Sequence, residues 1–108
     1  MNKRRHKRFI ITLNAQVVIG EKTYDGIISN VSEEGVSSTI TTYIKTDDAF
    51  SPQKKIRLIF ELPTGDLVEL ECEIRWYLRP QEKGKNLMLG LYIMEPPVIY
   101  REWIQKFQ

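Results

Sequence analysis

The chain has 108 residues, of which 42% are hydrophobic and 28% charged, a composition typical of one folded domain with its own core. Its single cysteine, Cys72, excludes a disulfide framework within the chain and favours a reducing compartment. Because no stretch is apolar enough for a signal peptide or a membrane span, we expect a cytoplasmic protein without membrane insertion.

The formal net charge of +2 hides an uneven distribution of charge along the sequence. Segment 1–8 holds five of the 16 basic residues and no acidic residue, which leaves 11 basic against 14 acidic residues elsewhere. A basic end on a mildly acidic body favours an anionic partner at the N-terminus, with a solubilising tail as the alternative. Because like charges repel and no apolar anchor precedes Phe9, we expect segment 1–8 to be flexible in the free protein.

Period-two alternation of apolar residues dominates the sequence and predicts β-strands. The first strand places one apolar face along residues 9–19, a turn follows at Gly20-Glu21-Lys22, and a second strand runs to about Ser29. Later strands are predicted at residues 35–42, 56–62, 68–76 and 87–94. Both faces of the last strand are apolar, which predicts burial on both sides.

The strand at 68–76 alternates most regularly, with five apolar positions on one face that include Cys72 and end at Trp76. We therefore expect Cys72 to be a buried, inert thiol and Trp76 to belong to the core. Three glutamates, Glu69, Glu71 and Glu73, occupy the opposite face. Their spacing favours a solvated strand face over a catalytic acid and base pair.

The last stretch of the chain has helical spacing. Pro96-Pro97 ends the last strand and suits a helix start, and Ile99, Trp103 and Phe107 then share one side of the helix. The predicted fold is mainly β, a six-stranded antiparallel β-barrel with a C-terminal α-helix and a flexible basic N-terminal arm. We expect a single domain, 1–108, made of an arm (1–8), a barrel (9–95) and a helix (96–108).

Two short motifs contain residue types that suit a ligand-binding site. They are Arg4 and Arg8 in the arm, and Asn30, Ser32 and Gly35 after the second strand. A hairpin that turns near residues 20–21 pairs positions whose numbers sum to about 41, so the two motifs meet at one end of the sheet. Arginine forks fit phosphate oxygens or the guanine edge, and asparagine and serine suit polar base edges. The implied ligand is anionic and carries a purine.

The spacing Arg4-x-x-x-Arg8 followed by Asn30-x-Ser32-x-x-Gly35 resembles the two-part signature of bacterial PilZ domains, over nearly the whole chain. The resemblance implies a receptor for cyclic di-GMP. In it, Arg4 and Arg8 would hold phosphates and guanine faces, Asn30 and Ser32 would bond guanine, and Gly35 would shape the loop. Such a domain orders its arm around the ligand and presents an altered surface to a protein effector.

The arm also contains Lys3 and Arg5, two further candidate ligand contacts. Lys3 stands where the family resemblance implies a selector between one bound nucleotide and an intercalated pair. Ile93 stands where the family often has an aromatic residue, which we interpret as a packing variant.

Other functions fit the sequence less well. The first alternative is a PilZ-like protein–protein adaptor that works without nucleotide. The second is a β-barrel that binds single-stranded nucleic acid, which ranks lower because the basic residues gather in one short arm rather than along a groove. With one histidine, His6, and one cysteine, no nitrogen and sulfur metal centre can form, and we expect no cofactor and no enzymatic activity.

Overall fold

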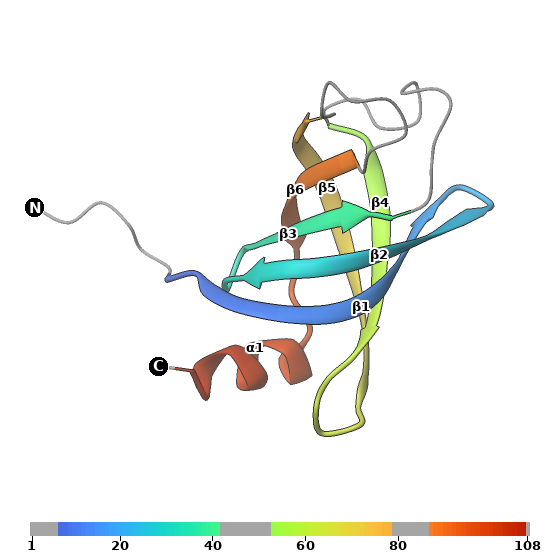
Figure 1. Cartoon of the computed structure of the whole chain (residues 1–108). Coiled ribbons are helices and arrows are strands. Elements are labelled where there is room, and N and C mark those ends of the chain that lie inside the picture. The colour runs from blue at the N-terminus through green and yellow to red at the C-terminus, as the bar shows by residue number, and fades with distance from the viewer. Residues whose placement is uncertain (1–6, 42–52, 79–86, 108) are drawn as a thin grey trace, which may run out of the picture.

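The computed structural model describes residues 7–41, 53–78 and 87–107, which form six strands and one helix (Figure 1). The elements in chain order are β1 (Phe9–Ile19), β2 (Lys22–Val31), β3 (Gly35–Ile40), β4 (Lys55–Glu61), β5 (Leu67–Leu78), β6 (Leu87–Met94) and α1 (Val98–Gln105). The predicted strands are all present. β2 ends two residues later than predicted, β5 is three residues longer, and β3 is two residues shorter.

The strands close into an antiparallel barrel in the order β1-β2-β3-β6-β5-β4. Closure is completed by β1 and β4, which pair from Ala15 to Val18. A closed barrel leaves no long edge strand for unwanted pairing. The predicted six-stranded antiparallel β-barrel with a C-terminal helix is confirmed.

Apolar side chains on the inner faces of all six strands fill the barrel. Fully buried examples come from each strand: Val17, Ile28, Ile40, Leu58, Leu70 and Leu89. Helix α1 lies beneath β1 in Figure 1 and adds Tyr100, Trp103 and Ile104 to this core. Ile99 and Phe107, which were expected on the same side of the helix as Trp103, remain 37% and 40% exposed.

The prediction that Trp76 belongs to the core was wrong. The pairing of β5 with β6 shifts between Ile74 and Trp76, and this irregularity reverses the alternation of side chains at the end of β5. Trp76 is therefore on the outer face with 46% of its surface exposed, while Tyr77 packs against the core. Met88 is also exposed, so β6 is not buried on both faces throughout.

The β1–β2 hairpin sets the position of the sequence motifs. Its two-residue turn has Gly20 at φ +61°, a conformation that favours glycine. Pairing is regular from Ile19↔Lys22 to Leu13↔Ile28, and then shifts before Ile10↔Asn30. Asn30 was expected opposite Ile11, so this irregularity moves it by one residue.

Within the described residues, no helix has the length and apolar character to cross a membrane.

Candidate functional site

Arg8 and Asn30 are in direct contact at the open end of the β1–β2 hairpin. The Nη1 atom of Arg8 donates a hydrogen bond to Oδ1 of Asn30 at 2.5 Å. Arg8 directly precedes β1 and is exposed, and Asn30 is in the last part of β2. A charged donor makes this a strong class of hydrogen bond. The guanidinium of Arg8 carries further N–H donors, and Asn30 carries an amide N–H₂ group, both of which suit a polar ligand.

Ser32 and Gly35 form a tight turn between β2 and β3. The backbone N–H of Ser32 donates to the carbonyl oxygen of Gly35 at 2.8 Å. The Ser32 hydroxyl accepts a hydrogen bond from the Gly35 N–H at 3.0 Å and donates to the Gly35 carbonyl oxygen at 3.3 Å. Because Ser32 is buried, its hydroxyl works mainly within its own loop, and it has little surface left for a ligand.

Gly35 gives the Arg8 side chain room to lie against the loop. A Cβ atom at this position would be 3.1 Å from Nη2 of Arg8, 3.3 Å from the carbonyl oxygen of Leu91 and 3.5 Å from Oγ of Ser32. A larger residue would therefore push the guanidinium away. The structure thus brings together Arg8, Asn30, Ser32 and Gly35 from two sequence segments.

A row of paired positions continues from Asn30 across the outer face of the barrel. Asn30 pairs with Ser37 on β3, Ser37 with Gly90 on β6, and Gly90 with Trp76 on β5. The indole of Trp76 lies directly over Gly90, in the space that a Cβ atom there would need. At the other end, Ile10 pairs with Asn30 and is 93% exposed. Small residues between two exposed apolar side chains make a shallow platform, which we call the Ile10–Trp76 platform.

A second row begins at Gly35, which pairs with Tyr92. The guanidinium carbon of Arg75 lies 4.5 Å from the centre of the Tyr92 ring, and Nε of Arg75 is 3.5 Å from a carboxylate oxygen of Glu73. Sequence reasoning missed the placement of Trp76, Tyr92 and Arg75 near the site. The only available signal was Gly90, a glycine within an apolar strand, which often marks a close approach of another group.

Four residues of the basic arm, Lys3, Arg4, Arg5 and His6, lie outside the described residues. Their predicted contacts with a ligand, and the predicted flexibility of that segment, therefore stay predictions.

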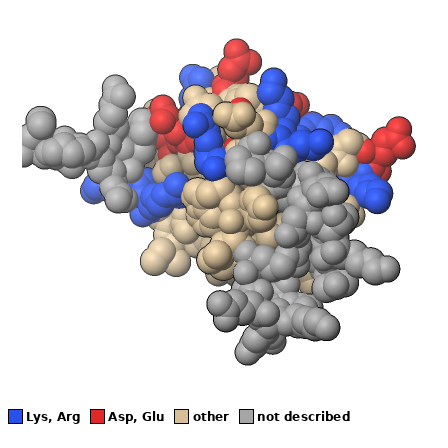
Figure 2. Space-filling model, turned by 90° about the horizontal axis from the view of Figure 1, so that it is seen from above, with Lys and Arg blue, Asp and Glu red and all other residues tan. Residues whose placement is uncertain are grey.

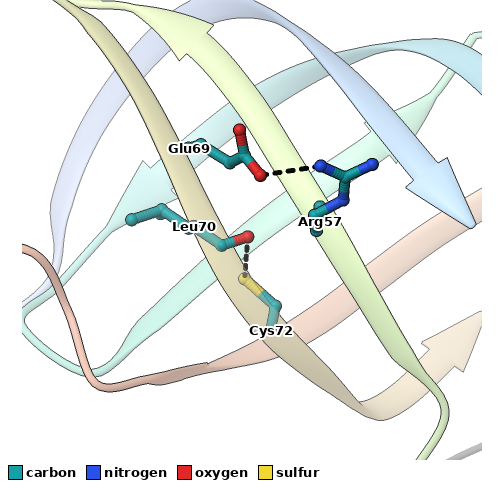
Figure 3. A network of polar contacts seen from close by, with 4 residues as sticks. All are labelled: Arg57, Glu69, Leu70 and Cys72. Carbon is teal, nitrogen blue, oxygen red and sulfur yellow. Dashed lines mark hydrogen bonds and ion pairs between the residues drawn. The ribbon is translucent and has the colours of Figure 1, made fainter.

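The described acidic and cysteine side chains outside the motifs include Glu69 and Cys72 on strand β5. Among the described residues, no group of three or more histidine, cysteine, aspartate or glutamate side chains is placed to hold a metal ion. Glu69 is exposed and forms an ion pair with Arg57 across β4 and β5 at 2.8 Å, on the opposite side of the strand from Cys72 (Figure 3). Burial, and secondarily the charge of Glu71, raises the pKa of the Cys72 thiol to about 12, which makes it a poor nucleophile.

Charge on one end of the barrel is mixed. Among the described residues visible in Figure 2, Lys and Arg residues gather along one side of the view with Asp and Glu residues among them, and uncharged residues lie beside them. A groove for single-stranded nucleic acid needs basic residues along its length. The visible surface does not favour that alternative.

The family comparison decides the identity of the fold. The sequence model of the PilZ domain matches residues 2–107, almost the whole chain. The chain belongs to the PilZ domain family. PilZ domains are receptors for cyclic di-GMP that act as binding and adaptor domains rather than as enzymes. The matched range spans the segments that carry both motifs, and the family resemblance seen in the sequence is confirmed.

Two solved structures share the fold. The inhibitor of motility MotI/DgrA from Bacillus subtilis has a TM-score of 0.77 and 18% identity, with 99% of this chain and 49% of that chain covered. The PilZ domain of YcgR from Escherichia coli, determined with c-di-GMP, has a TM-score of 0.75 and 9% identity, with 98% and 88% covered. The chain thus spans about half the length of MotI/DgrA. No curated protein sequence matches this PilZ chain.

Proposed function

We propose that this PilZ domain is a bacterial, cytoplasmic receptor for cyclic di-GMP that signals to a protein effector. The observation that carries the proposal is the contact of Arg8 with Asn30 directly beside the Ser32–Gly35 turn. Family membership adds the ligand class, because PilZ domains are cyclic di-GMP receptors.

In this proposal each residue has a distinct role. Arg8 holds a phosphate or the O6 and N7 edge of guanine through its planar fork. Asn30 orients Arg8 and offers its amide group to the base. Gly35 leaves space for the Arg8 side chain and the ligand. The Ser32 hydroxyl keeps the turn in shape through its two hydrogen bonds to Gly35.

The Ile10–Trp76 platform supports a flat, ring-bearing ligand. Asn30, Ser37 and Gly90 form a floor of small residues, and the indole of Trp76 borders it on one side. Stacking of a base on an aromatic side chain contributes about 1–3 kcal/mol. We propose that a guanine ring of the ligand lies over this platform.

The basic arm completes the proposed site. Arg4, with Lys3 and Arg5 as further contacts, would close over the ligand, because two phosphates offset the repulsion among the cations of segment 1–8. Ordering of the arm would then change the surface that a partner protein meets.

Isothermal titration calorimetry of the protein with cyclic di-GMP tests the proposal, and titrations with cyclic di-AMP and GTP are the controls. We expect saturable binding of cyclic di-GMP, at least tenfold weaker binding of the two controls, and weaker binding as salt concentration rises. The stoichiometry distinguishes one bound nucleotide from a pair. A folded protein that gives neither heat nor a thermal shift at saturating cyclic di-GMP contradicts the proposal.

A second candidate is a nucleotide-independent adaptor. It is favoured by the neighbouring exposed side chains of Trp76, Leu78 and Met88 on the outer face of β5 and β6, since Leu78 pairs with Met88. A folded protein that binds no nucleotide would make this function the leading one.

A further inference from the structure

Helix α1 reaches the candidate site through the side chain of Tyr100. Tyr100 is fully buried, and its hydroxyl donates a hydrogen bond to the backbone carbonyl oxygen of Ser32 at 2.6 Å. These two residues are 68 positions apart in the sequence. The hydrogen bond therefore fixes the Ser32–Gly35 turn to the C-terminal helix, beyond the bonds that the turn makes with itself.

A second contact joins the end of the helix to the start of β1. The rings of Phe9 and Phe107 are stacked, with centroids 4.9 Å apart and planes 25° apart. Phe9 directly follows Arg8, so this stack fixes the backbone from which Arg8 extends. The Trp103 ring lies between the two contacts, with its centroid 5.3 Å from that of Phe107 and 5.9 Å from that of Tyr100.

The electrostatics of Tyr100 agree with this arrangement. Burial raises the pKa of the Tyr100 hydroxyl above its ordinary value, Cys72 adds to the shift, and the positive charge of Arg8 partly opposes it. The hydroxyl therefore stays protonated and remains a donor at neutral pH.

We propose that helix α1 clamps the ligand site at two points, with Tyr100 as a positioning residue for the Ser32–Gly35 turn and Phe107 as a positioning residue for Arg8. The effect on ligand affinity rests on the proposed function, whereas the clamp itself does not. Because coupling between two sites is reciprocal, ligand binding tightens the helix contacts, and a partner protein that pulls on α1 weakens ligand binding.

Hydrogen–deuterium exchange on the ligand-free protein tests the first point. Tyr100→Phe keeps the ring and removes only the hydroxyl, so we expect faster exchange of the Ser32 and Gly35 amides, both of which donate hydrogen bonds within the turn. The matched control is Tyr24→Phe at the far end of β2, which should leave these two amides unchanged. Equal exchange in Tyr100→Phe and the wild type overturns this point.

The second point has its own variant pair. Phe107→Ala removes the stack on Phe9 and should speed exchange in segment 9–13, whereas Val98→Ala removes an exposed apolar side chain from the other end of the same helix and should not. Because Phe107 is partly exposed, the variant is expected to fold even if Tyr100→Phe does not. Unchanged exchange in segment 9–13 overturns the second point.

Titration with cyclic di-GMP then connects the clamp to the ligand. Because Tyr100→Phe loses one hydrogen bond, we expect it to bind cyclic di-GMP about fivefold more weakly than the wild type. Tyr24→Phe should bind cyclic di-GMP like the wild type. Absence of binding by the wild type contradicts the proposed function and leaves the exchange result to decide the clamp. If the wild type binds and Tyr100→Phe binds equally well, the coupling of helix to ligand is wrong.

Discussion

The two ends of the β1–β2 hairpin differ in structure. At the turn, pairing is regular from Ile19↔Lys22 to Leu13↔Ile28, and β1 also pairs with β4. At the other end the register shifts before Ile10↔Asn30, the described pairing of β1 with β4 has ended, and polar side chains meet at Arg8. We call these the closed end and the site end of the hairpin.

The difference separates stability from binding. At Ala15–Val18 the closed end has its β1 backbone paired with both β2 and β4 and its apolar side chains in the core, so this part contributes mainly to the free energy of unfolding. The side chains of Arg8 and Asn30 at the site end are polar donors at the surface that contribute little to stability and are suited to a ligand, whereas the buried Ser32–Gly35 turn beside them contributes to both stability and binding. Substitutions at the two ends should therefore affect different measurements.

The largest expected loss of stability comes from Leu58→Ala near the closed end. Leu58 pairs with Val17 and is fully buried. Loss of a buried leucine leaves a cavity, and we expect the free energy of unfolding to fall by about 2–5 kcal/mol in urea titrations. Leu67→Ala, at an exposed apolar position, is the control. Where Leu58→Ala is still folded, its affinity for cyclic di-GMP should stay within twofold of the wild type. A tenfold loss of affinity would show that substitutions near the closed end also affect binding.

A smaller loss of stability is expected from Ser32→Ala at the site end. The variant leaves the Gly35 N–H without its acceptor in a buried turn, at a cost of about 1–3 kcal/mol. Because the turn supports Arg8, cyclic di-GMP affinity should fall as well. Ser29→Ala, which removes an exposed hydroxyl from β2 together with its hydrogen bond to the Ser37 carbonyl oxygen at 3.3 Å, should lower both quantities less than Ser32→Ala. Full affinity in Ser32→Ala would show that the turn does not shape the site.

The same substitution at both ends gives the sharpest comparison. Gly20→Ala places a Cβ in open space but at φ +61°, which costs about 1–2 kcal/mol of stability. Gly35→Ala costs a similar amount by crowding Arg8 and the Leu91 carbonyl group. We expect only Gly35→Ala to weaken cyclic di-GMP binding, as measured by calorimetry. Equal affinities of the two variants would contradict the assignment of the site end.

The smallest effect concerns alkaline pH. The pKa of Cys72 is raised from 9.0 to about 12 in the folded protein, so the unfolded chain loses this proton first. The stability contributed by the buried thiol is fully present below pH 9 and is lost as pH rises from 9 towards 12. Between pH 8 and pH 9.5 we expect a decrease of about 1 kcal/mol in urea titrations. The Cys72→Ala variant should lack this decrease in stability. If the stability of the variant and of the wild type depended on pH in the same way, the assignment of the decrease to Cys72 would be wrong.

The sequence predicted the fold well because the barrel depends on a period-two pattern that each strand carries by itself. Val68, Leu70, Cys72 and Ile74 alternate into the core as expected. The prediction failed at Trp76, because a register shift depends on the pairing of two strands and leaves no local signal. For a similar reason the helical spacing alone did not show that Trp103 is buried while Ile99 and Phe107 are partly exposed, because the way α1 packs on the barrel decides which side is buried.

The candidate site was predictable in outline only. The hairpin sum brought the two motifs to one end of the sheet, and the structure places Arg8 in contact with Asn30 there, across 22 residues of sequence. The role of the Ser32 hydroxyl within its own turn and the hydrogen bond from Tyr100 could not be predicted, because they depend on which groups are buried and on how the helix docks. The platform residue Trp76 was missed through the same register shift.

The most direct test of the central claim compares Arg8→Ala with Lys22→Ala by isothermal titration with cyclic di-GMP. Each variant removes one exposed positive charge, Arg8 from the site end and Lys22 from the closed end of the same hairpin. Loss of a bidentate arginine contact costs about 1–3 kcal/mol, so we predict at least fivefold weaker binding by Arg8→Ala. Lys22→Ala should bind like the wild type, and both variants should unfold at similar urea concentrations. Equal affinity of the two variants would contradict the account.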